Sequence, residues 1–148
     1  MTLCKYESIM KRKKNYYFLV AGIIIFLSSI THALNGQRTV LAELESTSLG
    51  EGTLTIFRYI WHIITAENLI FGVALLWMGF AMYRVRIRFT VWLIATVLLT
   101  RWMVILLFTL AYDPSGISGF LIDGVVILLL VIILLLGNSA GRRKSMAG

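Results

Sequence analysis

Four runs of apolar residues dominate the sequence, and each is long enough to cross the hydrocarbon core of a bilayer, which needs roughly 20 residues. They cover residues 16–33, 59–83, 89–112 and 117–136. The longest segment between them, 34–58, is shorter than the roughly 40 residues that a domain needs to fold unaided. We therefore predict an all-α polytopic membrane protein, in which a single integral membrane domain forms a four-helix transmembrane bundle.

The composition excludes several other classes of protein. Of the 148 residues, 59% are hydrophobic and 14% are charged, whereas soluble domains have about 45–50% apolar and about 25% charged residues. The sequence has one cysteine, Cys4, which excludes a disulfide-stabilised secreted domain. The net charge of +7 does not indicate nucleic-acid binding, because that function requires a basic face on a soluble module.

The basic residues predict the orientation of the chain, because cytoplasmic loops of membrane proteins are enriched in lysine and arginine. Four crossings place eleven of the 14 basic residues on one side, while Arg38 and Arg58 lie on the other and Arg101 lies inside the third span. We therefore expect both termini in the cytoplasm and a location in the bacterial inner membrane. The eleven residues are Lys5, Lys11, Arg12, Lys13, Lys14, Arg84, Arg86, Arg88, Arg142, Arg143 and Lys144.

An alternative interpretation of the first span remains open. The residues KRKKN, FLVAGIIIFLSSI and THA together resemble a signal peptide that is cleaved after Ala33. Cleavage would leave three spans and place the new N-terminus outside the cell. We favour the uncleaved form, because Tyr16 and Tyr17 anchor the start of the span and no helix breaker precedes Thr31. A mature N-terminus at Leu34 would contradict this choice.

Short connections predict which spans are neighbours. Residues 84–88 join the second span to the third, and the Asp-Pro-Ser-Gly sequence at 113–116 is typical of a type I turn between the third and fourth. Within the outer loop 34–58, we expect residues 39–49 to form a short helix on the outer surface. The glycines at 50 and 52 would then end that helix.

Polar residues inside the spans are the candidates for a site. An ionisable group at the membrane centre costs at least about 2.5–3.5 kcal/mol and is usually paired. Counting residues from the span ends places Glu67, Arg101 and Asp123 in the outer half of the bundle. We predict a buried polar network there that consists of Glu67, Asn68, Arg101 and Asp123. The network either fixes the register of the helices or forms a working site.

Two histidines lie near the outer ends of the first two spans. His32 ends the first span and His62 begins the second. Histidines on neighbouring helices can bind a metal ion or ligate haem, although ordinary hydrogen bonding is the simpler interpretation. Each histidine shares a helical stripe with small or polar residues, a pattern typical of close helix–helix contacts. We predict helix packing at Gly72, Gly79 and Gly119.

The region around the two histidines resembles a known group of proteins. THALNG at the end of the first span and RYIWHIITAEN at the start of the second are similar to a pattern in small, uncharacterised bacterial four-helix membrane proteins. That pattern is a histidine before an Asn-Gly turn, followed by a Trp-His pair. By this resemblance, the matching positions are His32, Gly36, Trp61 and His62.

A second resemblance covers residues 69–144. Arg101 within a span, followed by Asp123 at the start of an ILLLVIILLLGNS helix, is similar to the phosphate-starvation-inducible E-type membrane proteins. Met78 and Gly79 stand where those proteins have an acidic residue in the second span. Both resemblances imply four spans, and neither implies a biochemical activity.

The sequence favours a non-enzymatic function. It contains no phosphate-binding glycine loop, HExxH motif, nucleophile elbow or CxxC pair. We expect an accessory subunit or regulator that lies in the lipid bilayer and packs, through its small-residue stripes, against other membrane subunits or further copies of itself. No cofactor is expected. The alternatives are an outward-facing site in which His32 and His62 bind haem, a metal ion or a quinone, and a transporter component that is active as an oligomer.

Overall fold

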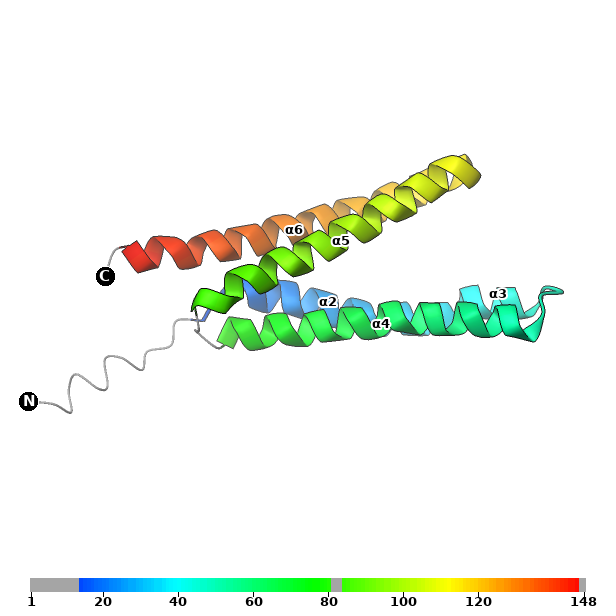
Figure 1. The fold of residues 1–148 in the computed structure, drawn as a ribbon, viewed down its shortest axis with the longest axis horizontal. Helices are drawn as coiled ribbons and strands as arrows, with labels where there is room; N and C mark the ends of the chain where they lie inside the picture. Colours follow the sequence, from blue (N-terminus) through cyan, green and yellow to red (C-terminus); the bar gives the residue numbers. More distant parts are fainter. Residues whose placement is uncertain (1–13, 81–83, 147–148) are drawn as a thin grey trace, which may run out of the picture. The chain divides into compact units, whose positions relative to one another are not determined.

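The computed structural model of the protein describes residues 14–80 and 84–146. Within these ranges the chain forms helices joined by short turns and contains no strand (Figure 1). Four helical stretches are long and apolar enough to cross a membrane: Tyr16–Glu45, Glu51–Phe80, Ile87–Tyr112 and Ile117–Ser139. The prediction of an all-α class with four helices long and apolar enough to cross a membrane is therefore confirmed. In chain order the elements are α2 (Tyr16–Asn35), η1 (Gly36–Val40), α3 (Leu41–Glu45), α4 (Glu51–Phe80), α5 (Arg84–Tyr112), η2 (Pro114–Gly116) and α6 (Ile117–Met146).

The chain divides into two compact units. The first unit, Val20–Trp77, contains most of α2, all of η1 and α3, and most of α4. The second, which we call the α5–α6 unit, contains the residues up to Leu19 and those from Met78 onward. It therefore includes the beginning of α2 and the end of α4 as well as α5 and α6.

Helices α2 and α4 pack on each other along a seam of residues spaced alternately three and four apart. This spacing keeps a narrow stripe of each helix facing its partner, as in coiled coils. Both stripes include small residues, so the two backbones approach closely. The buried seam residues are Gly22, Ile25, Ser29 and Gly36 before α4, and Leu54, Asn68, Gly72, Leu75 and Gly79 on α4.

Two glycines allow the backbones of α2 and α4 to approach each other closely. A Cβ atom added to Gly22 would lie 2.8 Å from the backbone nitrogen of Leu76, and one added to Gly72 would lie 2.8 Å from that of Phe26. Because the obstructing atoms belong to the backbone, a larger residue at either position would push the helices apart.

The first span continues through a π-helical segment, η1 (Gly36–Val40). A π-helical turn places one extra residue in a helix. Without that residue, the seam of α2 would continue to Thr39 and Glu43, which are both exposed. Instead Leu41 is buried and Leu44 is half-buried. The π-helical segment therefore keeps apolar side chains on the seam and leaves polar ones outside.

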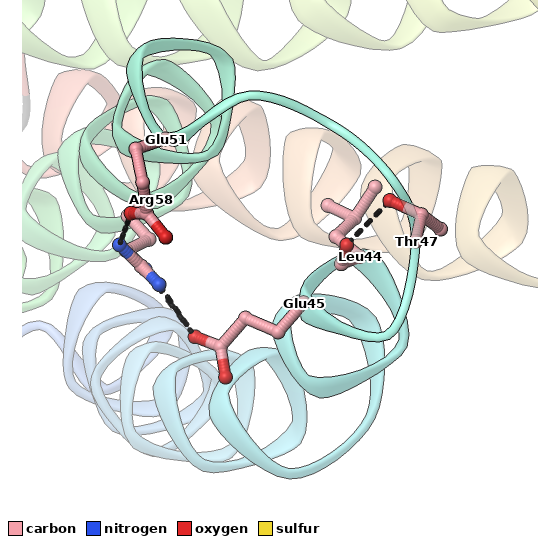
Figure 2. A network of polar contacts seen from close by, with 5 residues as sticks. All are labelled: Leu44, Glu45, Thr47, Glu51 and Arg58. Atoms are coloured by element: carbon pink, nitrogen blue, oxygen red, sulfur yellow. Dashed lines mark hydrogen bonds and ion pairs between the residues drawn. The ribbon is translucent and has the colours of Figure 1, made fainter.

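Arg58 connects the two sides of the turn between α3 and α4, as Figure 2 shows. Its Nη2 atom donates to Oε1 of Glu45 at 2.9 Å, and its Nη1 atom lies 3.8 Å from Oε2 of Glu51. Thr47 Oγ1 also donates to the carbonyl of Leu44 at 2.6 Å. Because the charged side chains are largely exposed, the ion pairs contribute only about 0.2–1 kcal/mol.

Helices α5 and α6 form an antiparallel hairpin, joined by the tight turn that the sequence predicts. Pro114 begins the 3-10 turn η2, and Ser115 Oγ donates to Oδ1 of Asp113 at 2.5 Å. Along the hairpin, the ring of Trp102 stacks on that of Phe120 with centroids 5.6 Å apart.

Asn15 connects three helices within the α5–α6 unit. Its Oδ1 atom accepts hydrogen bonds from the backbone N–H groups of Tyr17 at 3.2 Å and Phe18 at 3.5 Å, and so caps α2. Its Nδ2 atom donates to the carbonyl of Gly137 at 2.9 Å, and its backbone N–H donates to that of Gly79 at 3.0 Å. The beginning of α2 and the ends of α4 and α6 therefore lie together.

The helices are longer than the apolar runs in the sequence. Much of the predicted loop 34–58 is helical, because only 46–50 lies between α3 and α4. The predicted separate surface helix over 39–49 is wrong, since the helical residues there continue the first span. The predicted loop 84–88 belongs to α5, and 137–146 belongs to α6. Hydropathy marks only the part of a helix within hydrocarbon, whereas its backbone hydrogen bonds continue into water.

Outside the described residues lie Cys4, Lys5, Lys11, Arg12, Lys13 and Tyr83.

Candidate functional site

His32, Gly36 and Trp61 form a compact cluster between α2, η1 and α4. The imidazole ring of His32 stacks on the indole ring of Trp61, with centroids 4.3 Å apart and an angle of 1° between the planes. The indole Nε1–H group donates to the backbone carbonyl of His32 at 3.0 Å. A Cβ atom at Gly36 would overlap Nε1 and Cε2 of Trp61. Position 36 therefore needs glycine because the indole ring fills the space of a side chain.

The π-helical segment shapes the backbone beside this cluster. The N–H of Leu41 donates to the carbonyl of Gly36, five residues earlier. Asn35 has φ −66° and ψ −45°, and no glycine in the described residues has a positive φ. The Asn-Gly turn that the first resemblance implies is therefore wrong. The helix continues through this segment with one extra residue, and this residue places Leu41 on the seam. The chain therefore does not turn at Asn35 and Gly36.

His62 lies outside this cluster. Its side chain is exposed, and Trp61 is the neighbouring residue of α4 that contacts His32. Successive helical residues point about 100° apart, so a helix that directs Trp61 toward His32 directs His62 elsewhere. Within the described ranges, no group of three or more His, Cys, Asp or Glu residues could hold a metal ion. The ligand pair of His32 and His62 stays a prediction.

The four residues of the predicted polar network are divided between the two units. Asn68 is buried and Glu67 is half-buried, both in the Val20–Trp77 unit. In the α5–α6 unit, Arg101 is half-buried and Asp123 is exposed. Glu67, Asn68 and Arg101 each already have an interaction within the chain. The four-residue network therefore stays a prediction.

The three predicted packing glycines differ in their surroundings. Gly72 packs against Phe26, and a Cβ atom at Gly79 would lie 2.5 Å from Cδ2 of Leu19. Gly119 is exposed, and a Cβ atom there would meet no atom within 4 Å. Helix packing at Gly119 therefore stays a prediction, since no described residue contacts this position.

Two contacts of α6 were not predicted from the sequence. A Cβ atom at Gly124 would lie 2.6 Å from Nε1 of Trp102, and one at Gly137 would lie 2.7 Å from Cε1 of Phe18. The buried Nε1 atom of Trp102 has no acceptor among the described residues. Glycine within an apolar run is the only sequence signal for such contacts, and Gly119 carries the same signal without the contact.

Asn15 was also missed, although the sequence carries a signal for it. Asparagine directly before an apolar helical run is a preferred N-cap residue. Its second bond, to Gly137, could not be predicted because the two residues lie 122 positions apart.

Large apolar side chains cover the outside of the spans. In each span, at most 28% of the most hydropathic window is buried within the chain. Such an extensive apolar surface is typical of a surface that contacts a membrane or another protein. Conspicuous examples, each more than 60% exposed, are Ile70, Trp77, Phe89, Phe108, Tyr112 and Ile122.

No protein-family model, curated protein or solved structure matches this chain. Its function is therefore inferred from the residues and contacts described above.

Proposed function

We propose that the protein is a non-enzymatic subunit or regulator of a larger membrane assembly in the bacterial inner membrane. The apolar exterior of the spans carries this proposal. The sequence predicts that a stripe of small residues contacts a partner. In α4 this stripe already contacts α2, because Gly72 and Gly79 pack against that helix. A partner would therefore contact large apolar residues such as Ile70 and Ile122, through van der Waals packing in the bilayer.

The proposed topology has both termini in the cytoplasm. The eleven basic residues that four crossings place on one side support it by the positive-inside rule. Asn15 further supports it, because its contacts with Gly79 and Gly137 bring the beginning of the first span and the end of the last together.

A hairpin projecting from the membrane would provide a second surface for a partner. The stretches Tyr16–Glu45 and Glu51–Phe80 each have 30 residues, or about 45 Å at 1.5 Å per residue. The hydrocarbon core is about 30 Å thick, so about 15 Å of each helix extends beyond it. This projecting part contains the Arg58 ion pairs.

Purification of the tagged chain from native membranes in mild detergent tests this proposal. We expect a complex in which another membrane protein is present at fixed stoichiometry through successive columns. The matched variants Ile70→Ala and Ile122→Ala remove exposed side chains without opening the seams, and at least one should reduce the yield of the complex severalfold. Recovery of the chain without any other protein would contradict the proposal.

A ligand site at His32 is a second candidate, supported by the stacked rings of His32 and Trp61. An imidazole beside an indole could bind a quinone headgroup or ligate haem. Absorbance in the haem Soret region, metal analysis and solvent extraction of quinones from the purified protein would test this candidate. Loss of the bound group in His32→Ala would support it, whereas a preparation free of haem, metal and quinone would exclude it.

A further inference from the structure

Three segments of the α5–α6 unit that lie far apart in the sequence meet beside a positive charge. The backbone N–H group of Asn15 donates to the carbonyl of Gly79, and its Nδ2 atom donates to that of Gly137. Lys14 precedes Asn15 and is exposed, and its Nζ atom lies 5.5 Å from the centre of the Phe80 ring. The beginning of α2, the end of α4 and the end of α6 therefore lie together around Lys14.

Further basic residues follow directly on α5 and α6. Arg84 begins α5 four residues after Phe80, a separation of at most about 14 Å. Arg88, one helical turn later, has an exposed side chain. On α6, a basic group follows at about 8–10 Å along the helix from Gly137. We call the following residues the basic end of the unit: Lys14, Arg84, Arg86, Arg88, Arg142, Arg143 and Lys144.

The acidic residues in the described part of this unit lie far from the basic end. They are Asp113 and Asp123. Asp113 is 25 residues after Arg88, and Asp123 is 14 residues before Gly137, which correspond to about 37 Å and about 21 Å along the helices. Salt screens exposed charges beyond about 8 Å at physiological ionic strength. Neither carboxylate therefore neutralises the basic end.

Two tyrosines indicate the depth of the basic end in a bilayer. Tyr16 and Tyr17 begin α2 directly after Asn15, and their side chains are 71% and 43% exposed. Tyrosine is enriched at membrane–water interfaces, where its ring lies at the level of the lipid headgroups. The basic end therefore combines headgroup depth with a positive charge that no described carboxylate of the unit balances.

We propose that the basic end binds the headgroup of an anionic phospholipid. Lysine and arginine form charge-assisted hydrogen bonds with phosphate oxygens, and basic sites beside transmembrane helices bind anionic lipid headgroups. The two bonds of Asn15 hold the contributing segments together, so the site depends on the tertiary structure as well as on the charge. This inference requires no other subunit and can therefore fail or hold independently of the proposed function.

Native mass spectrometry of the full chain in detergent tests the site, with phosphatidylglycerol and phosphatidylcholine as the probes. Phosphatidylglycerol should bind at a small, fixed stoichiometry, and phosphatidylcholine, which has no net charge, should bind at least about fivefold more weakly. The double variant Lys14→Gln with Arg88→Gln should weaken binding of phosphatidylglycerol about 25-fold, because each basic residue near an anionic lipid contributes about fivefold. Equal binding of the two lipids, or unchanged binding by the double variant, would overturn the proposal.

Two control variants separate the site from net charge and from packing. Arg38→Gln with Arg58→Gln removes the same charge from the Val20–Trp77 unit and should leave binding of phosphatidylglycerol unchanged. Lys14→Arg with Arg88→Lys keeps both charges and should also retain binding. If the first control loses as much binding as the test variant, net charge alone explains the binding. If the second control loses it, the two side chains act through packing. Either result would contradict the proposal.

Discussion

Asn15 shows how one side chain can combine a local and a long-range role. Its Oδ1 atom caps the first turn of α2, and its Nδ2 atom bonds to the carbonyl of Gly137. The cap acts within three residues, whereas the bond to Gly137 determines where the last helix meets the first. The two roles use different atoms and can therefore be separated by substitution.

We expect Asn15→Ala to lower the free energy of unfolding by about 2 kcal/mol, as the sum of a lost N-cap of about 1 kcal/mol and a lost hydrogen bond of about 1 kcal/mol. Asn15→Asp keeps the capping oxygen but loses the Nδ2 donor, so it should lose about half as much. Unfolding in mixed micelles of increasing denaturing-detergent content, followed by tryptophan fluorescence, would measure both. Equal stabilities of Asn15→Asp and Asn15→Ala would refute the separation of roles.

Gly36 is a second position at which one added carbon atom should change the stability of the protein. Gly36→Ala places a methyl group against the indole ring of Trp61 and should cost about 1–3 kcal/mol, as overpacking usually does. Gly52→Ala is the matched control, because a Cβ atom there meets nothing within 4 Å. The control should be neutral or stabilising by about 0.4–1 kcal/mol. The same unfolding assay compares the two, and a Gly36→Ala variant as stable as Gly52→Ala would mean that Trp61 is not held in place.

Among the elements, η1 corrects the register of the first span. Its extra residue rotates the helix so that Leu41 and Leu44 replace Thr39 and Glu43 on the seam toward α4. The apolar pattern in the sequence is therefore interrupted by one residue. For this reason a strict α-helical repeat, continued from the span, misplaces every residue after Gly36.

Deletion of the exposed residue Gln37 should remove the π-helical segment and leave a continuous α-helix. The spacing from Gly36 to Val40 and Leu44 then becomes three and seven residues, which suits the seam. We expect a loss of stability of about 0.5 kcal/mol, typical of a surface change. Deletion of the exposed residue Ile63 should cost more than about 4 kcal/mol, because it rotates the rest of α4 by about 100° off its seam. Similar losses for both deletions in the micelle unfolding assay would contradict this account of η1.

At the scale of the whole molecule, several glycines of the described residues lie in contacts between helices, while many large apolar side chains are exposed. Gly22, Gly72 and Gly124 lie in contacts between helices, while Trp77 and Ile122 face outward. This arrangement suits a bilayer, where lipid covers large apolar side chains and small residues allow helices to pack closely.

The proposed topology predicts which positions a membrane-impermeant maleimide can reach in intact spheroplasts. Ser48→Cys and Ser115→Cys, each in a Cys4→Ser background, lie in the exposed turns after α3 and α5 and should be labelled from outside. Cys4 of the unchanged chain should be labelled only after permeabilisation. Labelling of Cys4 in intact spheroplasts would invert the topology, and loss of Cys4 from the mature chain would indicate cleavage after Ala33.

The number and approximate positions of the spans could be predicted from the residues alone. The thickness of hydrocarbon sets the length of an apolar run, and each backbone must satisfy its own hydrogen bonds there, so both requirements are local. The tight turn around Pro114 could be predicted for the same reason, since proline presets its own backbone angle.

Which side of each helix meets a neighbour could not be predicted, because that rotation depends on contacts between residues far apart in the sequence. The sequence presents Trp61 and His62 as adjacent candidates, and packing places Trp61 against His32 while His62 remains exposed. Likewise Gly72 and Gly119 carry the same signal, and among the described residues a helix contact is seen at Gly72 but not at Gly119. Successive residues of a helix point about 100° apart. The rotation of each helix about its own axis therefore decides which residues meet a neighbour, and tertiary packing sets that rotation.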